Sequence, residues 1–296
     1  MLLIATLTAA GSSWAIASAS VPTAQRIEGE GHADIYVVRP DGSHRLQLTR
    51  AEDDIYYTWP AWSHDGKRIA YSGPVCADCR DGLFVVGTDG KGVRRLPIGK
   101  LPGDHPTWDP TGKRVAFAGG DGALYVFDLR KKSVHRLTGN RAAHDQPAWS
   151  PNGRRIAYIL QQPNGRWDVW TIAASGRDPR KLTRSAATEA EPSWSPDGKS
   201  IAFTRQVAGR WQLWIMNADG SAQRRITAGL LSDETPTWSP DGRRLAFGRV
   251  TLNAIYVIDL ASGRTERVRT GVYSSSSPTW SPSGNTIAFV GQPPQK

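Results

Sequence analysis

Cysteine is scarce in this chain of 296 residues, which contains only two. That number excludes a disulfide-dense scaffold and a zinc site built from four cysteines. The sequence also lacks a Gly-x-Ser-x-Gly nucleophile elbow, a phosphate-binding loop, a His-Glu-x-x-His motif and a calcium-loop pattern. No stretch after the first twenty residues is apolar over the length of about 20 residues that a spanning helix needs. These absences argue against the common hydrolase, nucleotide-binding and metalloprotease classes, and we expect no cofactor.

The first twenty residues resemble an export signal. Residues 1–20 carry no charge, and the apolar run Leu2–Leu7 is followed by two small-x-small sequences, Ala15–Ala17 and Ala17–Ala19. Such a pattern is typical of a signal peptide with its cleavage site. Because the usual Lys or Arg before the apolar run is missing, a frayed apolar tail is the alternative. We predict a signal peptide over 1–20, a single domain over 21–296, and a periplasmic or secreted protein with no membrane span after signal removal.

The rest of the chain is organised by a repeat. The phrase Pro-x-Trp occurs six times, and its tryptophans are separated by 46, 41, 45, 44 and 42 residues. They are Trp62, Trp108, Trp149, Trp194, Trp238 and Trp280. This period is that of a four-stranded β-propeller blade.

Each tryptophan opens the same local pattern. In the fourth repeat a Ser-Pro-Asp-Gly turn follows Trp194, and the triad Ile201-Ala202-Phe203 comes next. Proline presets φ in the turn and glycine takes a left-handed conformation, while large-small-large alternation indicates a strand. Both faces of a blade are buried, so we expect the small residue of one triad to lie against a bulky ring of the next blade.

A second hairpin accompanies each repeat, but it is offset along the chain. The first copy, residues 34–49, precedes the first Pro-x-Trp, and the last Pro-x-Trp hairpin ends near Val290 with no partner after it. A circular arrangement resolves both loose ends without leaving an open sheet edge. The predicted fold is therefore all-β: a six-bladed β-propeller of four-stranded blades, closed by pairing of the N-terminal hairpin with the C-terminal hairpin.

The repeat resembles a known family. The stretch from Trp194 to Phe203, followed by a hairpin that begins at Leu213 and ends in Arg-Ile-Thr, is similar to the TolB-type β-propeller repeat, and the likeness extends over residues of about 32 to 290. The resemblance implies the propeller fold, which serves envelope scaffolds and the propeller domains of some peptidases. We expect the propeller alone, without the additional α/β domain that can precede it and without a trailing hydrolase domain.

Acidic residues gather in the loops that enter the first strand of each repeat. Asp104, Asp145 and Glu234 share one position, four residues before their tryptophans, and Glu191 and Asp233 lie close to it. If the first strand lines the channel, these side chains form an acidic arc at one mouth; a merely solvated rim is the alternative. The candidate binding residues are Trp59, Asp104, His105, His144, Asp145, Glu191, Asp233 and Glu234.

Three of these candidates admit a second interpretation. Trp59, next to Pro60, is either a binding anchor or closure packing. His105 and His144 stand beside aspartates, a combination that suits a metal or acid–base chemistry, although polar mouth residues bonded to the backbone would look the same. We predict no catalytic residues and no metal site.

The two cysteines lie close together, as Cys76-Ala77-Asp78-Cys79 in a long loop. In an exported protein this spacing favours a local disulfide between Cys76 and Cys79. A redox-active pair is the alternative, but such pairs normally sit at a helix N-terminus, and none is evident here.

The functional hypothesis is an exported, non-enzymatic propeller that binds a protein or peptide presenting Lys or Arg at the acidic mouth. The alternative is a lyase or hydrolase acting on a polysaccharide or peptide through the His/Asp cluster. With 37 Lys+Arg against 27 Asp+Glu the chain carries a net charge of +10, and the opposite face could dock on an anionic polymer. Nucleic acid is not expected, because the basic strips lack interleaved aromatic residues.

Overall fold

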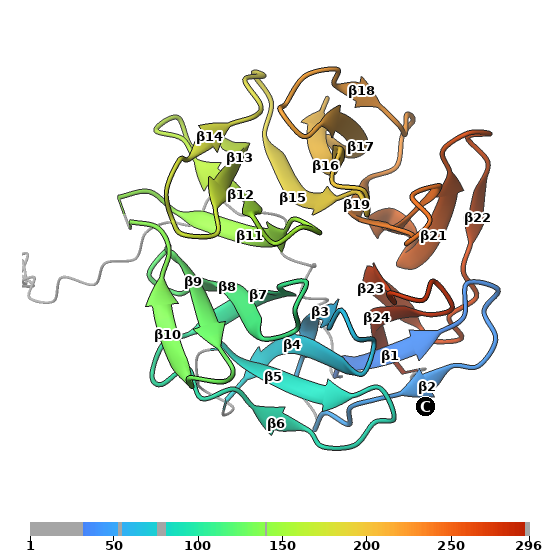
Figure 1. The fold of residues 1–296 in the computed structure, drawn as a ribbon. Coiled ribbons are helices and arrows are strands. Elements are labelled where there is room, and N and C mark those ends of the chain that lie inside the picture. The colour runs from blue at the N-terminus through green and yellow to red at the C-terminus, as the bar shows by residue number, and fades with distance from the viewer. Residues whose placement is uncertain (1–31, 53–54, 76–80, 140, 294–296) are drawn as a thin grey trace, which may run out of the picture.

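A computed structural model describes residues 32–52, 55–75, 81–139 and 141–293. In it, six four-stranded antiparallel sheets are arranged around a central axis (Figure 1). This confirms the predicted all-β, six-bladed propeller. The predicted signal peptide and the Cys76–Cys79 pair lie outside the described residues. In the part of the chain that the structure covers, no helix has the length and apolar character needed to cross a membrane.

The strands occupy four concentric positions. The innermost strands are β3 (Thr58–Trp62), β7 (Gly103–Trp108), β11 (His144–Trp149), β15 (Glu189–Trp194), β19 (Asp233–Trp238) and β23 (Ser274–Trp280). The second strands are β4 (Arg68–Pro74), β8 (Arg114–Gly119), β12 (Arg155–Gln161), β16 (Ser200–Val207), β20 (Arg244–Arg249) and β24 (Ile287–Gln292). The third strands are β5 (Asp81–Gly87), β9 (Leu124–Asp128), β13 (Trp167–Ala173), β17 (Arg210–Asn217), β21 (Ala254–Asp259) and β1 (Asp34–Val38). The outer strands are β6 (Arg94–Arg95), β10 (Ser133–Arg136), β14 (Arg180–Lys181), β18 (Arg224–Arg225), β22 (Thr265–Arg267) and β2 (Leu46–Gln47). A short 3₁₀ turn, η1 (Val250–Leu252), connects β20 to β21.

The closing blade combines both ends of the sequence. Its strand order is β2-β1-β24-β23, and Ile35 pairs with Val290 in the antiparallel ladder. The ring of Tyr36 stacks on Phe289 with centroids 5.6 Å apart. This confirms the predicted closure by the N-terminal hairpin, and Figure 1 shows the blue β1 beside the red β24.

The core lies between blades, where the large-small-large triads meet. All six triads are fully buried. Ala70 packs in one cluster with Phe117 of the next blade, and Ala202 likewise with Phe247. The small side chain leaves the space that the neighbouring ring fills, as the sequence predicted.

The repeated tryptophans join neighbouring blades. The indole N–H of Trp108 donates to the carbonyl oxygen of Ala61 at 3.1 Å, and that of Trp238 donates to Ser193 at 3.0 Å. The guanidinium of Arg68 lies over the Trp108 ring, 4.7 Å from its centroid. Trp108, Trp149 and Trp280 are buried, whereas the other three are half-buried.

The outermost strands carry much of the positive charge. Two of them, β6 and β18, consist of exposed arginine pairs. Charged side chains on an edge strand discourage pairing with another chain. The positive rim thus has a structural explanation, and docking on an anionic polymer stays a prediction.

Candidate functional site

One residue in each innermost strand adopts a left-handed backbone conformation. These residues immediately precede the proline of Pro-x-Trp, and their φ values lie between 49° and 55°. They are Trp59, His105, Gln146, Glu191, Thr235 and Ser277, and we call them the pre-proline ring. Positive φ is uncommon outside glycine, and here it recurs at every blade.

Proline explains the bulge. In each innermost strand the pairing register shifts around this position, for example between Asp145 and Ala148 or between Glu234 and Thr237. Proline has no N–H to give to the ladder, so the strand bulges there and the preceding residue turns out of the regular alternation. The pre-proline ring and its prolines then line a central cavity of about 180 Å³.

His105 is the positive member of the ring. Its Nδ1 lies 3.0 Å from Oδ1 of Asp145 and 3.5 Å from Oδ2 of Asp104. Burial alone would lower the pKa of His105, but the charges of Asp145 and Asp104 outweigh burial and raise it to about 9. The same ion pair holds the pKa of Asp145 below its usual value, although burial opposes this. His105 therefore carries a proton at neutral pH.

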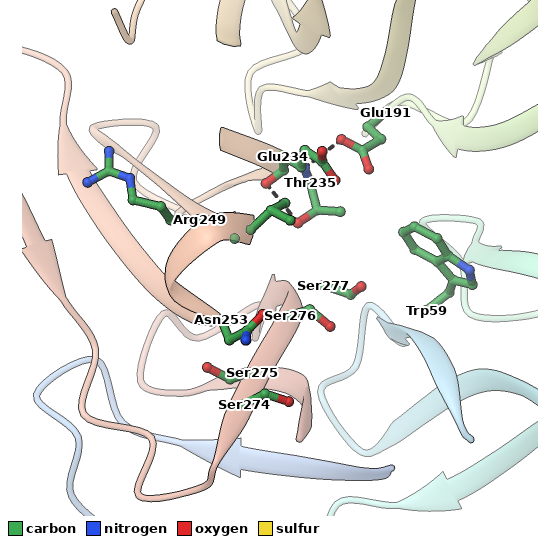
Figure 2. Close-up of a pocket in the computed structure, with 12 residues that line it drawn as sticks. Trp59, Glu191, Glu234, Thr235, Arg249, Asn253, Ser274, Ser275, Ser276 and Ser277 are labelled. Carbon is green, nitrogen blue, oxygen red and sulfur yellow. Dashed lines mark hydrogen bonds between the residues drawn. The ribbon is translucent and has the colours of Figure 1, made fainter. Parts of the chain in front are cut away.

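Trp59 packs against this histidine. The two ring centroids are 4.1 Å apart, with an angle of 36° between the planes. An aromatic face attracts a cation, so the contact favours the protonated imidazole. The indole also lines the channel, together with the carboxyl of Glu191 (Figure 2).

Glu191 and Glu234 form the negative part of the ring's mouth. Burial raises the pKa of Glu191 to about 7, against the lowering effect of a hydrogen bond from the Thr235 N–H. Burial, then the charges of Glu191 and Asp233, raise the pKa of Glu234 to about 8. Like charges close together in a largely buried site disfavour joint ionisation, so the pair retains a proton near neutral pH.

Asp233 lies next to Glu234 in sequence but has a different role. It is buried and accepts two hydrogen bonds from Arg249, from Nε at 2.7 Å and from Nη2 at 3.2 Å. Glu189 is neutralised in the same way by Arg205, whose Nε lies 2.8 Å away. These two ion pairs occupy equivalent positions in adjacent blades, and each neutralises its own carboxylate.

His144 stands apart from the other candidates. Its Nδ1 is 3.1 Å from the carbonyl oxygen of Gly122, and its ring packs near Tyr158. Burial lowers the pKa of His144. Among the described contacts, none joins His144 to His105 or Asp145, so the three do not form one acid–base unit.

Several buried polar atoms of the ring have no hydrogen-bond partner within the described part of the chain. They are Nε2 of His105, Nε2 of Gln146, Oε1 of Glu191 and Oγ of Ser277. An unsatisfied buried polar atom is costly, and native proteins keep few of them. Four of them around one channel indicate that a polar occupant, water or ligand, belongs there.

Sequence interpretation overlooked three members of the ring, Gln146, Thr235 and Ser277. Their uncharged side chains do not attract attention. The shared position directly before each repeated proline was the available clue. Among the residues that the structure describes, no three His, Cys, Asp or Glu side chains are grouped so that they could hold a metal ion.

Six four-stranded blades around a polar channel define a six-bladed β-propeller. Residues 76–289 match the model of the TolB β-propeller domain family, and the chain belongs to that family.

Solved structures agree with the fold. A putative TolB from Agrobacterium tumefaciens is 20% identical, with 90% of this chain and 100% of that chain covered and a TM-score of 0.75. TolB from Acinetobacter baumannii is 19% identical, with 88% and 63% covered and a TM-score of 0.62. An oligogalacturonate lyase in complex with manganese is 11% identical, with 90% and 99% covered and a TM-score of 0.58. A comparison with curated proteins gave no match.

Proposed function

We propose that this chain is an exported, non-enzymatic propeller that binds a protein or peptide in the cell envelope through the mouth of its channel. The observation that carries the proposal is the pre-proline ring, with its unpartnered polar atoms and with Trp59 on the wall. A rigid aromatic surface beside polar groups without partners is typical of a binding hot spot. Membership of the TolB-like family supports a protein partner.

The geometry favours binding over the alternative of acid–base chemistry. His105 keeps its proton at neutral pH and so cannot accept one as a general base. The ring of His144 is engaged elsewhere, in a hydrogen bond with the carbonyl oxygen of Gly122. An acid and a base that act on one bond must both reach it, and these two histidines share no partner.

Site-specific photo-crosslinking tests the proposal. A photoreactive residue at Asn253, which is exposed and lines the pocket at the mouth, should crosslink to a defined envelope protein. The same group at Arg225, exposed on the outer strand β18, is the matched control and should not give that product. The Asn253 product should disappear when Trp59→Ala is added. Crosslinking that is equal at both positions, or unaffected by Trp59→Ala, would refute binding at the mouth.

A further inference from the structure

A small pocket opens at the channel mouth, where the innermost strands of several blades meet. It has a volume of about 60 Å³, and its wall includes Trp59, Glu191, Glu234, Ser276 and Ser277 (Figure 2). These wall residues lie on strands: Glu191 on β15, Glu234 on β19, and the serines on β23. The pocket therefore presents two carboxyls and several serine hydroxyls, all carried on strands.

The two oxygens of Glu191 differ. Oε2 accepts the N–H of Thr235 at 2.6 Å and the hydroxyl of Thr204 at 3.2 Å. Oε1 is buried and accepts no hydrogen bond from the described residues. The residue as a whole is 8% exposed, so its surroundings offer Oε1 little compensation from bulk solvent. A carboxylate fixed by two donors on one oxygen leaves the other oxygen oriented and available.

The nearby cations are already engaged. Arg249 lines the pocket, but its guanidinium binds Asp233 and packs over Tyr256 at 4.5 Å from the ring centroid. His105 faces Asp145 on the other side of Gln146. The charge of His105 acts on Glu191 from a distance, but among the described residues no cation forms an ion pair with Glu191 or Glu234.

We propose that the pocket between Glu191 and Glu234 binds one primary ammonium group of a peptide partner. The group would come from a lysine side chain or from a free amino terminus. This inference rests on the proposed function and names the chemistry that the mouth recognises.

The geometry prefers ammonium to guanidinium. An ammonium ion has three donors on one small centre, which suit Oε1 of Glu191, the Glu234 carboxyl and Oγ of Ser277. A guanidinium gains its advantage by binding both oxygens of one carboxylate, and at Glu191 it cannot do so because Oε2 is already taken. Only Glu234 could offer both oxygens, so a guanidinium would engage one carboxyl fully where an ammonium can engage both. The face of Trp59 can pack on the alkyl stem and attract the charge.

Small-molecule titration of the full chain tests the inference, with binding followed by NMR. Acetyl-lysine methylamide represents the lysine source, alanine methylamide represents the amino-terminal source, and calcium chloride tests a divalent ion. One of the two amines should bind, and the same compound with its amine acetylated should not. Glu191→Gln and Glu234→Gln should each weaken binding at least tenfold, whereas Glu266→Gln, exposed on β22, should leave it unchanged.

The same titration has a pH arm. The carboxyls must lose protons to hold the ammonium, so affinity for acetyl-lysine methylamide, whose amine stays charged, should rise from pH 6 to pH 8.5. Other groups that bear on the pair are Asp233, which is bound to Arg249, and His105, whose raised pKa of about 9 keeps it mostly protonated over most of this range. A separate melting curve for each variant checks that it is folded.

Three results would overturn the inference: no binding of either amine, equal binding by Glu191→Gln, or binding of calcium alone. These results are separable from failure of the proposed function. Crosslinking from Asn253 without ammonium binding leaves partner binding intact and removes only the ammonium pocket. Ammonium binding without a crosslinked partner leaves the ammonium pocket intact and removes the proposed partner binding at the mouth.

Discussion

Ionising Glu191 and Glu234 at the channel mouth destabilises the folded state. The pKa of each carboxyl is raised by burial, and Glu191 further raises that of Glu234. A carboxyl whose pKa is higher in the folded state stabilises folding below its unfolded pKa, and that stability is lost as pH rises through the folded value. His105, raised to about 9, acts in the same direction between its ordinary value and 9.

We therefore expect thermal stability to fall between pH 5 and pH 9. Glu234→Gln removes one of these carboxyls while keeping its shape, so it should raise the melting temperature at pH 8.5 by at least ~2 °C, which corresponds to about 1 kcal/mol. At pH 5, where the carboxyl is already protonated, the change should be small. The measurement is a melting curve at both pH values, with Glu266→Gln as the exposed control. A lower melting temperature for Glu234→Gln at pH 8.5 would contradict this account.

Residue-level roles were the hardest to predict from the sequence. Asp233 and Glu234 are adjacent acids, yet the first is buried against Arg249 and the second lines the pocket. Strand alternation places the two side chains on opposite faces, and both residues keep regular pairing because the register shift comes only after Glu234. Which of the two faces the pocket depends on how the strand sits in the blade, which the local sequence does not show. Arg249 lies on the next strand, 16 residues away, so nothing local marks it as the partner of Asp233.

At the scale of elements, prediction was much more successful. The triads and the Pro-x-Trp phrases encode strand, turn and blade contact together, and each is repeated six times. Where one copy of the repeat departs from the pattern, the other copies still identify the strand or turn. The order of the blades in space follows from the order of the repeats along the chain. Burial of the repeated tryptophans is less uniform than their spacing, since Trp108 is buried and Trp194 is half-buried.

Trp108→Ala should be strongly destabilising. The change removes a buried ring between blades, its hydrogen bond to Ala61 and the surface on which Arg68 packs. Truncation of a core tryptophan typically costs ~3–5 kcal/mol, or at least about 6 °C in a domain of this size. Trp194→Ala, at the half-buried copy, should cost less. Melting temperatures within about 1 °C of the unmodified protein for Trp108→Ala would show that the seam does not depend on the ring.

At the scale of the whole molecule, the propeller is a closed circle of blades in which the first and last strands belong to the same blade. Asp34 pairs with Gly291 in neighbouring strands of one blade, so the two ends of the propeller lie side by side. A permuted chain in which a short turn joins Gln292 to Asp34, with new ends between β10 and β11, should fold to the same ring. Circular dichroism and the melting temperature check this, with a loss of a few degrees expected.

The control for permutation is a chain that ends at Trp280. It keeps β23 but lacks β24, so β1 pairs only with β2 and the closing blade is incomplete. We expect this chain to aggregate or remain unfolded, because an open edge is exposed. If it melts as cooperatively as the intact protein, the seam between β1 and β24 contributes little to stability.

The shared blade also determines when folding of the propeller can be completed. β1 is the earliest strand described and β24 the latest, so the pair cannot form until almost the entire chain has been made. At synthesis rates of ~5–20 residues per second, β1 waits on the order of ten to fifty seconds for its partner. Through that interval an apolar strand, Ile35 to Val38, lacks its final cover. A protein built this way completes its closing blade last, and until then its first strand is open to pairing with other chains.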